Sequence, residues 1–176
     1  MGLKVLNAPI INILIGLIGF YLTVLILLYV FQSQFIFLPR KISSAQKSFL
    51  IKFEQSEVSF HINDQILHGW FINKGINKNN PIVIYYGGNA EEVSQNLYDL
   101  SKFSGHSLLL INYRGYGNSS GKPSEKNLLN DALAIFDTFK KDQDIKGDEI
   151  ILMGRSLGTS VATYVAANRD IKAIIL

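Results

Sequence analysis

The sequence predicts an α/β fold, in which a mostly parallel sheet with helices on both faces follows one transmembrane helix and an antiparallel hairpin. Three observations lead to this prediction. From Pro81 onward, continuous apolar runs alternate with segments of helical periodicity, as in strands that are buried on both faces. Residues 57–72 alternate polar and apolar side chains about a central turn, as in a hairpin. Residues 10–31 carry no charged side chain.

Residues 10–31 form the predicted membrane anchor. Asn12 and Thr23 interrupt an otherwise apolar run of 22 residues, and a helix of this length spans about 33 Å, enough for a hydrocarbon core of about 30 Å. Aromatic side chains gather toward its C-terminal end, as at a membrane interface: Tyr29, Phe31, Phe35 and Phe37. A cleaved signal peptide is the alternative, but its apolar core is shorter, about 7–15 residues, and a small-x-small cleavage site is lacking here.

The sequence divides into four expected segments: a tail over residues 1–9, the anchor over 10–31, a connector over 32–56 and a folded domain over 57–176. The anchor predicts a single-pass membrane protein whose partner over residues 10–31 is the lipid bilayer. Lys4 precedes the anchor, whereas Arg40, Lys41 and Lys47 follow it. The positive-inside tendency therefore favours a cytoplasmic C-terminal domain.

Composition and loop sequences exclude several classes of function. Seventeen Lys and Arg against 14 Asp and Glu give a net charge of +3, without the concentrated basic face of a nucleic-acid binder. The lack of cysteine excludes disulfides, thiolate metal sites and a thiol nucleophile. Tyr116 and Pro123 stand where a phosphate loop needs glycine and a hydroxyl, and Ser120 interrupts a dinucleotide fingerprint. We therefore expect no nucleic-acid partner, no metal and no cofactor.

The expected elements follow one another in a regular order. Strands are expected at residues 57–62, 66–72, 82–86, 107–113, 149–153 and 172–176. Helices are expected near residues 93–100, between Ser124 and Gly147, and over 157–168. The second helix has an apolar stripe at helical spacing: Leu129, Ala132, Leu133, Phe136 and Phe139. Three acids on these helices are expected to be solvated: Asp99, Asp131 and Asp137.

Residues 154–158 (GRSLG) form a G-x-S-x-G motif between an expected strand and an expected helix. A serine on such a tight turn adopts a strained backbone, and glycines two residues to either side leave room for it. The turn exposes the Ser156 hydroxyl at the carboxyl edge of the sheet, where the helix N-terminus favours developing negative charge. The motif predicts a nucleophile elbow, which is the tight turn over residues 154–158. Ser156 would be the nucleophile, and Gly154 and Gly158 are the elbow glycines.

Acyl transfer needs at least two hydrogen-bond donors aimed at the developing oxyanion. The backbone N–H of Leu157 is one candidate, because it directly follows the serine. The second is expected from the turn after an earlier buried strand, where residues 87–90 (GGNA) lie. Taken alone, these glycines are explained equally well by an ordinary turn.

Four motifs occur in the order seen in α/β-hydrolases: residues 85–91, 112–121, 123–125 and 154–158. Over residues 57–176 the chain resembles membrane-anchored, serine-peptidase-like or lysophospholipase-like hydrolases of this superfamily. The resemblance implies an α/β-hydrolase fold, of which this chain holds the N-terminal part. It implies that Ser156 is the nucleophile, that the amides of Leu157 and Asn89 form the oxyanion hole, and that an ester, thioester or amide is hydrolysed through acyl-Ser156.

In this superfamily the acid and the histidine of the triad follow the serine along the chain. Here His61, His68 and His106 all precede Ser156, and Asp170, the one later acid, comes too early. The two later strands that carry these groups in the family are missing. We therefore expect the chain to be truncated and inactive, because a serine hydroxyl without a base is a weak nucleophile.

Three functional readings stay open. The first is a membrane-tethered serine hydrolase, and the second is a truncated, inactive piece of one. The third is a non-catalytic, membrane-anchored module that keeps the hydrolase scaffold for binding. The substrate, a small molecule or an acyl compound, is not identified by these residues.

Overall fold

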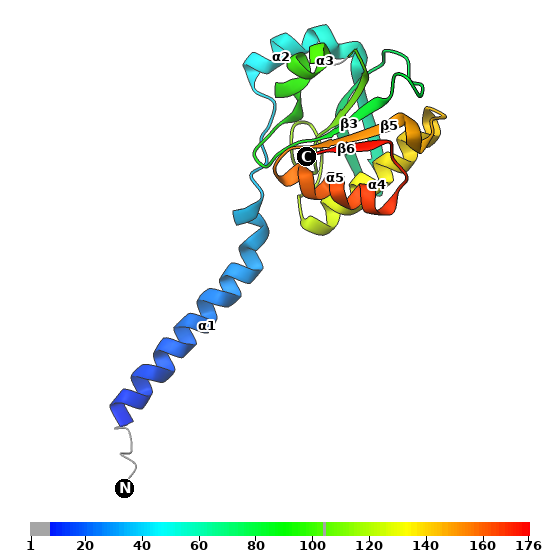
Figure 1. Ribbon diagram of the computed structural model, residues 1–176. Helices are drawn as coiled ribbons and strands as arrows, with labels where there is room; N and C mark the ends of the chain where they lie inside the picture. Colours follow the sequence, from blue (N-terminus) through cyan, green and yellow to red (C-terminus); the bar gives the residue numbers. More distant parts are fainter. Residues whose placement is uncertain (1–7, 104) are drawn as a thin grey trace. The chain divides into compact units, whose positions relative to one another are not determined.

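The computed structural model describes residues 8–103 and 105–176 (Figure 1). Residues 1–7, most of the expected tail and Lys4 with it, lie outside the described residues. The chain forms two compact units, residues 1–36 and residues 37–176.

The described part of the first unit is helix α1, Ala8–Ile36. Its most apolar window of 18 residues has a mean hydropathy of 2.7 and no buried side chain. The polar Thr23 hydroxyl donates to the carbonyl of Gly19 at 2.9 Å, so its hydrogen bond is satisfied within the helix. By length and composition α1 could cross a membrane, although a signal sequence would pass the same criteria.

The second unit is built on a six-stranded sheet with the strand order β1-β2-β4-β3-β5-β6. The strands are β1 Glu57–Ile62, β2 Gln65–Ile72, β3 Ile82–Tyr86, β4 Ser107–Ile111, β5 Ile150–Gly154 and β6 Ala173–Ile175. β1 and β2 form an antiparallel hairpin, β2 also pairs antiparallel with β4, and the other neighbours are parallel. The predicted mostly parallel sheet with a preceding hairpin is confirmed.

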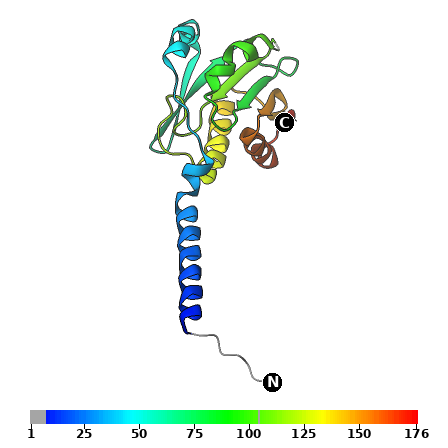
Figure 2. The same ribbon diagram turned by 90° about the vertical axis from the view of Figure 1, so that its left-hand side faces the viewer.

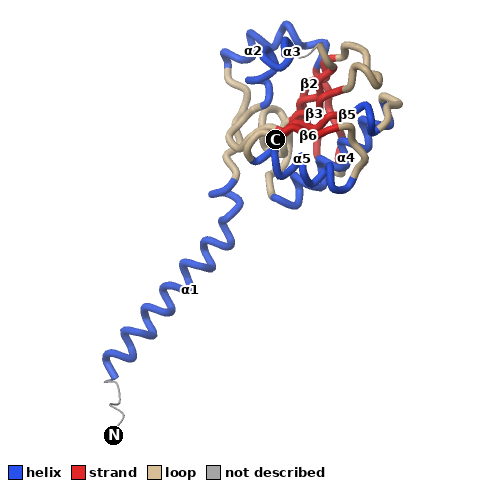
Figure 3. Tube along the Cα trace, in the orientation of Figure 1, coloured by secondary structure: helices blue, strands red, loops and turns tan. Residues whose placement is uncertain are grey.

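Helices cover both faces of this sheet, as Figures 1 and 2 both show. One face carries α2 Ser44–Leu50 and α3 Leu97–Phe103, with the 3₁₀ turns η1 Ile51–Ser56 and η2 Val93–Asn96, whereas the other carries α4 Glu125–Asp142 and α5 Leu157–Asn168. A third 3₁₀ turn, η3 Gly147–Glu149, precedes β5. Figure 3 shows the strands as a layer between these helices.

Strand residues alternate between the two helical layers, because successive side chains of a strand point to opposite faces. On β3, Ile84 packs with the α4 and α5 side and Tyr85 with the α2 and α3 side. All five side chains of β3 and all five of β4 are buried. These central strands hold their carboxyl ends, where the site is expected, in fixed positions.

Several boundaries differ from the sequence-based prediction. β4 ends at Ile111 rather than at Tyr113, although the backbone N–H of Asn112 still donates to the carbonyl of His68 on β2 at 3.0 Å. α4 ends at Asp142, before Gly147, and the first expected helix is divided between η2 and α3. β6 holds three residues rather than five.

Two expected side-chain environments are wrong. Phe37 does not belong to an exposed aromatic belt: it is 6% exposed and packs in the core between the sheet and α4. Asp131 is not solvated, because the Arg114 guanidinium reaches it with two hydrogen bonds of 2.7 Å and the carboxylate is buried. The buried face of α4 accordingly includes Leu128 and Ile135 in place of Leu129 and Leu133, which are half-buried.

Candidate active site

Ser156 follows Arg155 between the end of β5 and the start of α5. Its backbone has φ 51° and ψ −115°, a left-handed region that non-glycine residues rarely adopt. The side chain is exposed and makes no capping hydrogen bond to α5. The preceding N–H, of Arg155, donates to the carbonyl of Tyr86 at 3.1 Å and ties this turn to the end of β3. The serine therefore presents its hydroxyl at the carboxyl edge of the sheet.

The glycines on either side of Ser156 permit close backbone contacts. A Cβ atom on Gly154 would lie 2.4 Å from the carbonyl oxygen of Gly158, so the strand end touches the first turn of α5. A Cβ atom on Gly158 would lie 2.0 Å from the carbonyl oxygen of Tyr86 and 2.7 Å from that of Gly87. The glycines thus allow α5 to pack closely against the ends of β3 and β5, in addition to leaving room for the serine itself.

The turn after β3 lies beside the serine. A Cβ atom on Gly88 would be 3.6 Å from the Cβ of Ser156 and 3.4 Å from the carbonyl oxygen of Arg155. Ala90, in the same turn, has φ 55°, a positive value like that of the serine. The fold thus brings together the two turns that the sequence singled out, and each contains a non-glycine residue with positive φ.

Asn89 holds this turn through its side chain. Its Oδ1 accepts hydrogen bonds from the N–H of Leu38 at 3.0 Å, the hydroxyl of Tyr116 at 2.8 Å and the N–H of Ala90 at 3.0 Å. Burial raises the pKa of Tyr116, so its hydroxyl remains a donor at neutral pH. The Tyr113 hydroxyl donates to the carbonyl of Gly87 at 2.8 Å. The turn is therefore fixed from several sides.

A buried carboxylate, Glu91, joins the two turns. Its oxygens accept from the hydroxyl of Tyr85 at 2.7 Å, the N–H of Gly88 at 2.9 Å and the guanidinium of Arg155 at 3.4 Å. Sequence reasoning assigned it no role, although an acid directly after the predicted turn over residues 87–90 was a usable signal.

The histidines and Asp170 lie away from the elbow. His61 is exposed on β1, and His68, on β2, is buried and lies 3.2 Å from a carboxylate oxygen of Glu57. His106 stands just before β4, at the amino end of the parallel strands, and pairs with Asn80 at 2.7 Å. The carbonyl of Asp170 packs on Gly147. Among the described hydrogen bonds and ion pairs, none joins these four side chains to Ser156.

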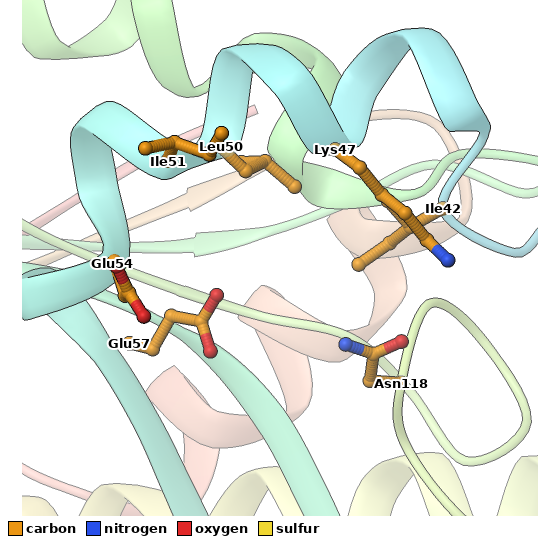
Figure 4. Close-up of a pocket in the computed structure, with 7 residues that line it drawn as sticks. All are labelled: Ile42, Lys47, Leu50, Ile51, Glu54, Glu57 and Asn118. Carbon is orange, nitrogen blue, oxygen red and sulfur yellow. The ribbon is translucent and has the colours of Figure 1, made fainter.

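An open pocket of about 310 Å³ lies elsewhere on the domain (Figure 4). The carboxylates of Glu54 and Glu57 lie side by side on one wall, and Lys47 and Asn118 lie on the other side of it. The residues that form the elbow do not line this pocket. Within residues 8–103 and 105–176, no group of three or more His, Cys, Asp or Glu is placed to hold a metal ion.

Comparison with known proteins identifies similar chains. The alpha/beta hydrolase domain-containing protein aho-3 of Caenorhabditis elegans is 36% identical over 97 residues, which make up 53% of this chain and 29% of aho-3. The lysophosphatidylserine lipase ABHD12 of Rattus norvegicus is 39% identical over 90 residues, 48% of this chain and 22% of that protein. The chain thus matches less than a third of the length of either relative.

A solved structure agrees with these relatives. The alpha-beta hydrolase of Vibrio vulnificus superposes with a TM-score of 0.63 at 25% identity, covering 77% of this chain and 49% of that one. The family model described as the alpha/beta hydrolase fold matches residues 66–176. This match includes both turns and the elbow serine. The chain belongs to the alpha/beta hydrolase fold family.

Proposed function

We propose that this chain is a membrane-anchored serine hydrolase domain that cleaves an ester, thioester or amide through an acyl-Ser156 intermediate. The carrying observation is the left-handed backbone of Ser156, which leaves the hydroxyl exposed and uncapped at the start of α5. An N-cap residue that only stabilises its helix does not need a strained backbone, whereas such strain is found at functional sites. The elbow glycines Gly154 and Gly158 support the proposal, because neither position has room for a side chain.

The oxyanion would be bound by the backbone amides of Leu157 and Asn89. Leu157 follows the serine at the N-terminus of α5, where the helix dipole favours negative charge. Asn89 lies in the turn beside Ser156, and its own side chain holds that turn. In the reaction the serine oxygen would attack the acyl carbon and lose its proton to solvent water, while these two amides stabilise the charge on the former carbonyl oxygen. Collapse of this intermediate would expel the alcohol, thiol or amine, which takes up a proton, and a water molecule would then hydrolyse acyl-Ser156 and release the acid.

The described residues supply no base for Ser156, since His61, His68 and His106 lie on other strands or at the opposite edge of the sheet. We propose that catalysis by these 176 residues alone is slow for this reason. A hydroxyl that keeps its proton is a weak nucleophile, and loss of a triad member typically lowers the rate by orders of magnitude.

Membrane attachment through residues 10–31 is part of the proposal. It rests on the uncharged, exposed helix α1, and the cations that follow the helix favour a cytoplasmic domain on a single-pass chain. An acyl lipid is the substrate class that a bilayer would supply. The name of the rat relative, a lysophosphatidylserine lipase, supports such an ester.

The test is labelling of the full chain in detergent micelles with a fluorophosphonate, followed by peptide mapping. We expect the phosphonate on Ser156, slowly, and no labelling of the Ser156→Ala variant. Labelling that is equal in the two proteins, or absent from folded protein over long incubation at high probe concentration, would contradict the proposal.

A non-catalytic binding module is the second candidate, favoured by the missing base. In that case Ser156→Ala would leave any cellular effect of the chain intact. Loss of the effect in that variant would point back to acyl chemistry.

A further inference from the structure

The two turns of the proposed oxyanion site come from distant parts of the chain. One follows β3 and the other follows β5, so their mutual placement needs a contact that spans both. Hydrogen bonds between main-chain atoms supply one such contact, from the Arg155 N–H to the Tyr86 carbonyl. This bond fixes the strand end but does not reach the Gly88–Ala90 part of the first turn.

The carboxylate of Glu91 does reach both turns. Its Oε2 accepts the N–H of Gly88 at 2.9 Å in the first turn and lies 3.4 Å from the Arg155 guanidinium, next to the serine, in the second. Its Oε1 accepts from Tyr85 at 2.7 Å and from Asn96 at 2.5 Å, which anchors the carboxylate to β3 and η2.

The hydrogen bonds of the Glu91 carboxylate are buried, so breaking them is costly. The Glu91 side chain is 7% exposed, whereas that of Arg155 is 67% exposed. A buried charge needs its hydrogen bonds, because water cannot replace them. Burial and the neighbouring carboxylate raise the pKa of Tyr85 well above its ordinary value, so the phenol stays a donor. Glu91 therefore cannot move without leaving several groups unpaired.

The bond to Gly88 also selects which amide of the turn is used. An N–H that donates to the Glu91 carboxylate points toward that side chain, so it is not the donor for an oxyanion at Ser156. The Ala90 N–H also has an acceptor, Oδ1 of Asn89, and the amide proposed as the donor of this turn is that of Asn89.

We propose that Glu91 is a positioning residue of this site, which holds the turn after β3 in register with the serine elbow. The inference rests on the proposed function, since it assigns Glu91 a role in building the oxyanion hole. Glu91 does not touch the reacting atoms, and its effect passes through the amides of the two turns.

The test uses a thiol in place of the serine hydroxyl. The chain has no cysteine, so Ser156→Cys introduces its single thiol, whose pKa is given by the rate of iodoacetamide alkylation against pH. Into this parent, in micelles and ¹⁵N-labelled, we add Glu91→Ala together with Arg155→Ala. The pair removes one charge of each sign, so the net charge near the thiol is unchanged.

The matched control removes a similar ion pair elsewhere, Asp137→Ala with Arg169→Ala, whose atoms are 2.6 Å apart between α4 and the end of α5. We expect the Glu91 and Arg155 double variant to shift the amide resonances of Gly88 and Leu157 and to raise the thiol pKa by about one unit. The control should change neither.

Unchanged Leu157 resonance and thiol pKa in the double variant would overturn the inference. If the double alanine variant fails to fold, the double variant Glu91→Gln with Arg155→Gln keeps nearly the same side-chain volumes. The same two measurements, the Leu157 resonance and the thiol pKa, then decide the result. A failure of the proposed function looks different: the parent thiol would have an ordinary pKa of about 8.5, while the amide shifts on removal of Glu91 would still occur.

Discussion

Ser124 and Ser156 are the N-cap residues of α4 and α5, and they use their hydroxyls differently. Ser124 caps α4 from an extended backbone, φ −154°, and its side chain accepts the N–H of Asn127 at 3.2 Å. Ser156 caps α5 from a left-handed backbone, φ 51°, and makes no such bond. One hydroxyl stabilises a helix, as N-cap residues commonly do, and the other is held away from its helix at an energetic cost. The difference separates a structural serine from one that is available for chemistry.

Filling the space behind the elbow serine should have the largest effect. Gly158→Ala would place a Cβ atom 2.0 Å from the Tyr86 carbonyl oxygen, so α5 must shift or the strand end must move. We expect a loss of about 3 kcal/mol or more in the free energy of unfolding. Urea unfolding followed by the fluorescence of Trp70, which is fully buried and the chain's single tryptophan, measures it.

The corresponding position after the other serine is Lys126, which is exposed. Lys126→Ala should change stability by less than about 0.5 kcal/mol. Equal effects of the two alanines would show that the contact between α5 and the central strands is not tight.

Removing the two hydroxyls should have unequal effects. Ser124→Ala deletes a cap bond and should cost about 1 kcal/mol. Ser156→Ala deletes no cap bond and should be close to neutral, because the hydroxyl is exposed. The same urea titrations test this pair, and a larger loss for Ser156→Ala would mean that its hydroxyl has a structural role.

Relief of the backbone strain at Ser156 should change the free energy of unfolding by a smaller amount. Glycine adopts positive φ without the steric cost of about 1–2 kcal/mol that other residues meet, although it loses more entropy on folding. We expect Ser156→Gly to stabilise the domain by about 0.5 kcal/mol. Ser124→Gly, at an extended backbone, should give no gain. A destabilised Ser156→Gly variant would argue that the left-handed backbone is not strained.

The smallest expected effect concerns the ion pair between the two compared helices. Hydrogen bonds from Arg169 hold the pKa of Asp137 below its ordinary value of 3.8. A carboxyl with a lowered pKa in the folded state contributes stability above pH 4, and this contribution is lost as the pH falls through the lower value. Asp137→Asn should therefore lose stability relative to the unmutated chain at pH 6, and this loss should shrink as the pH falls below 3.8, as measured by urea midpoints. A constant difference across this range would contradict the assignment.

Much of the fold follows from local sequence patterns. The buried strands β3 and β4 and the helix α5 were predictable because their apolar runs and periodicity are strong. The tight turn at Ser156 was predictable because glycines two residues to either side permit a close approach. These features depend on a few neighbouring residues, which is the range over which sequence patterns are reliable.

Buried charges could not be predicted in the same way. Asp131 has the sequence environment of a solvated helix residue, but it is paired with Arg114, which lies 17 residues earlier. Glu91 follows a turn and precedes a second acid, but it is buried and lies within hydrogen-bond distance of Arg155, next to the elbow serine. Phe37 lies next to an apolar helix in the sequence but packs in the core of the domain. Each of these depends on a partner distant along the chain, which local periodicity does not register.

The most direct test compares thiols at the two serines. In separate proteins, Ser156→Cys and Ser124→Cys each introduce one thiol at the N-terminus of a helix, and iodoacetamide alkylation against pH gives both pKa values. At both sites the helix N-terminus should lower the thiol pKa. Only at position 156 should the amides of Leu157 and Asn89 stabilise the thiolate further. We predict a thiol pKa at position 156 that lies below the one at position 124 and well below about 8.5. An equal or higher pKa at position 156 would contradict the claim that this serine faces an anion-stabilising site.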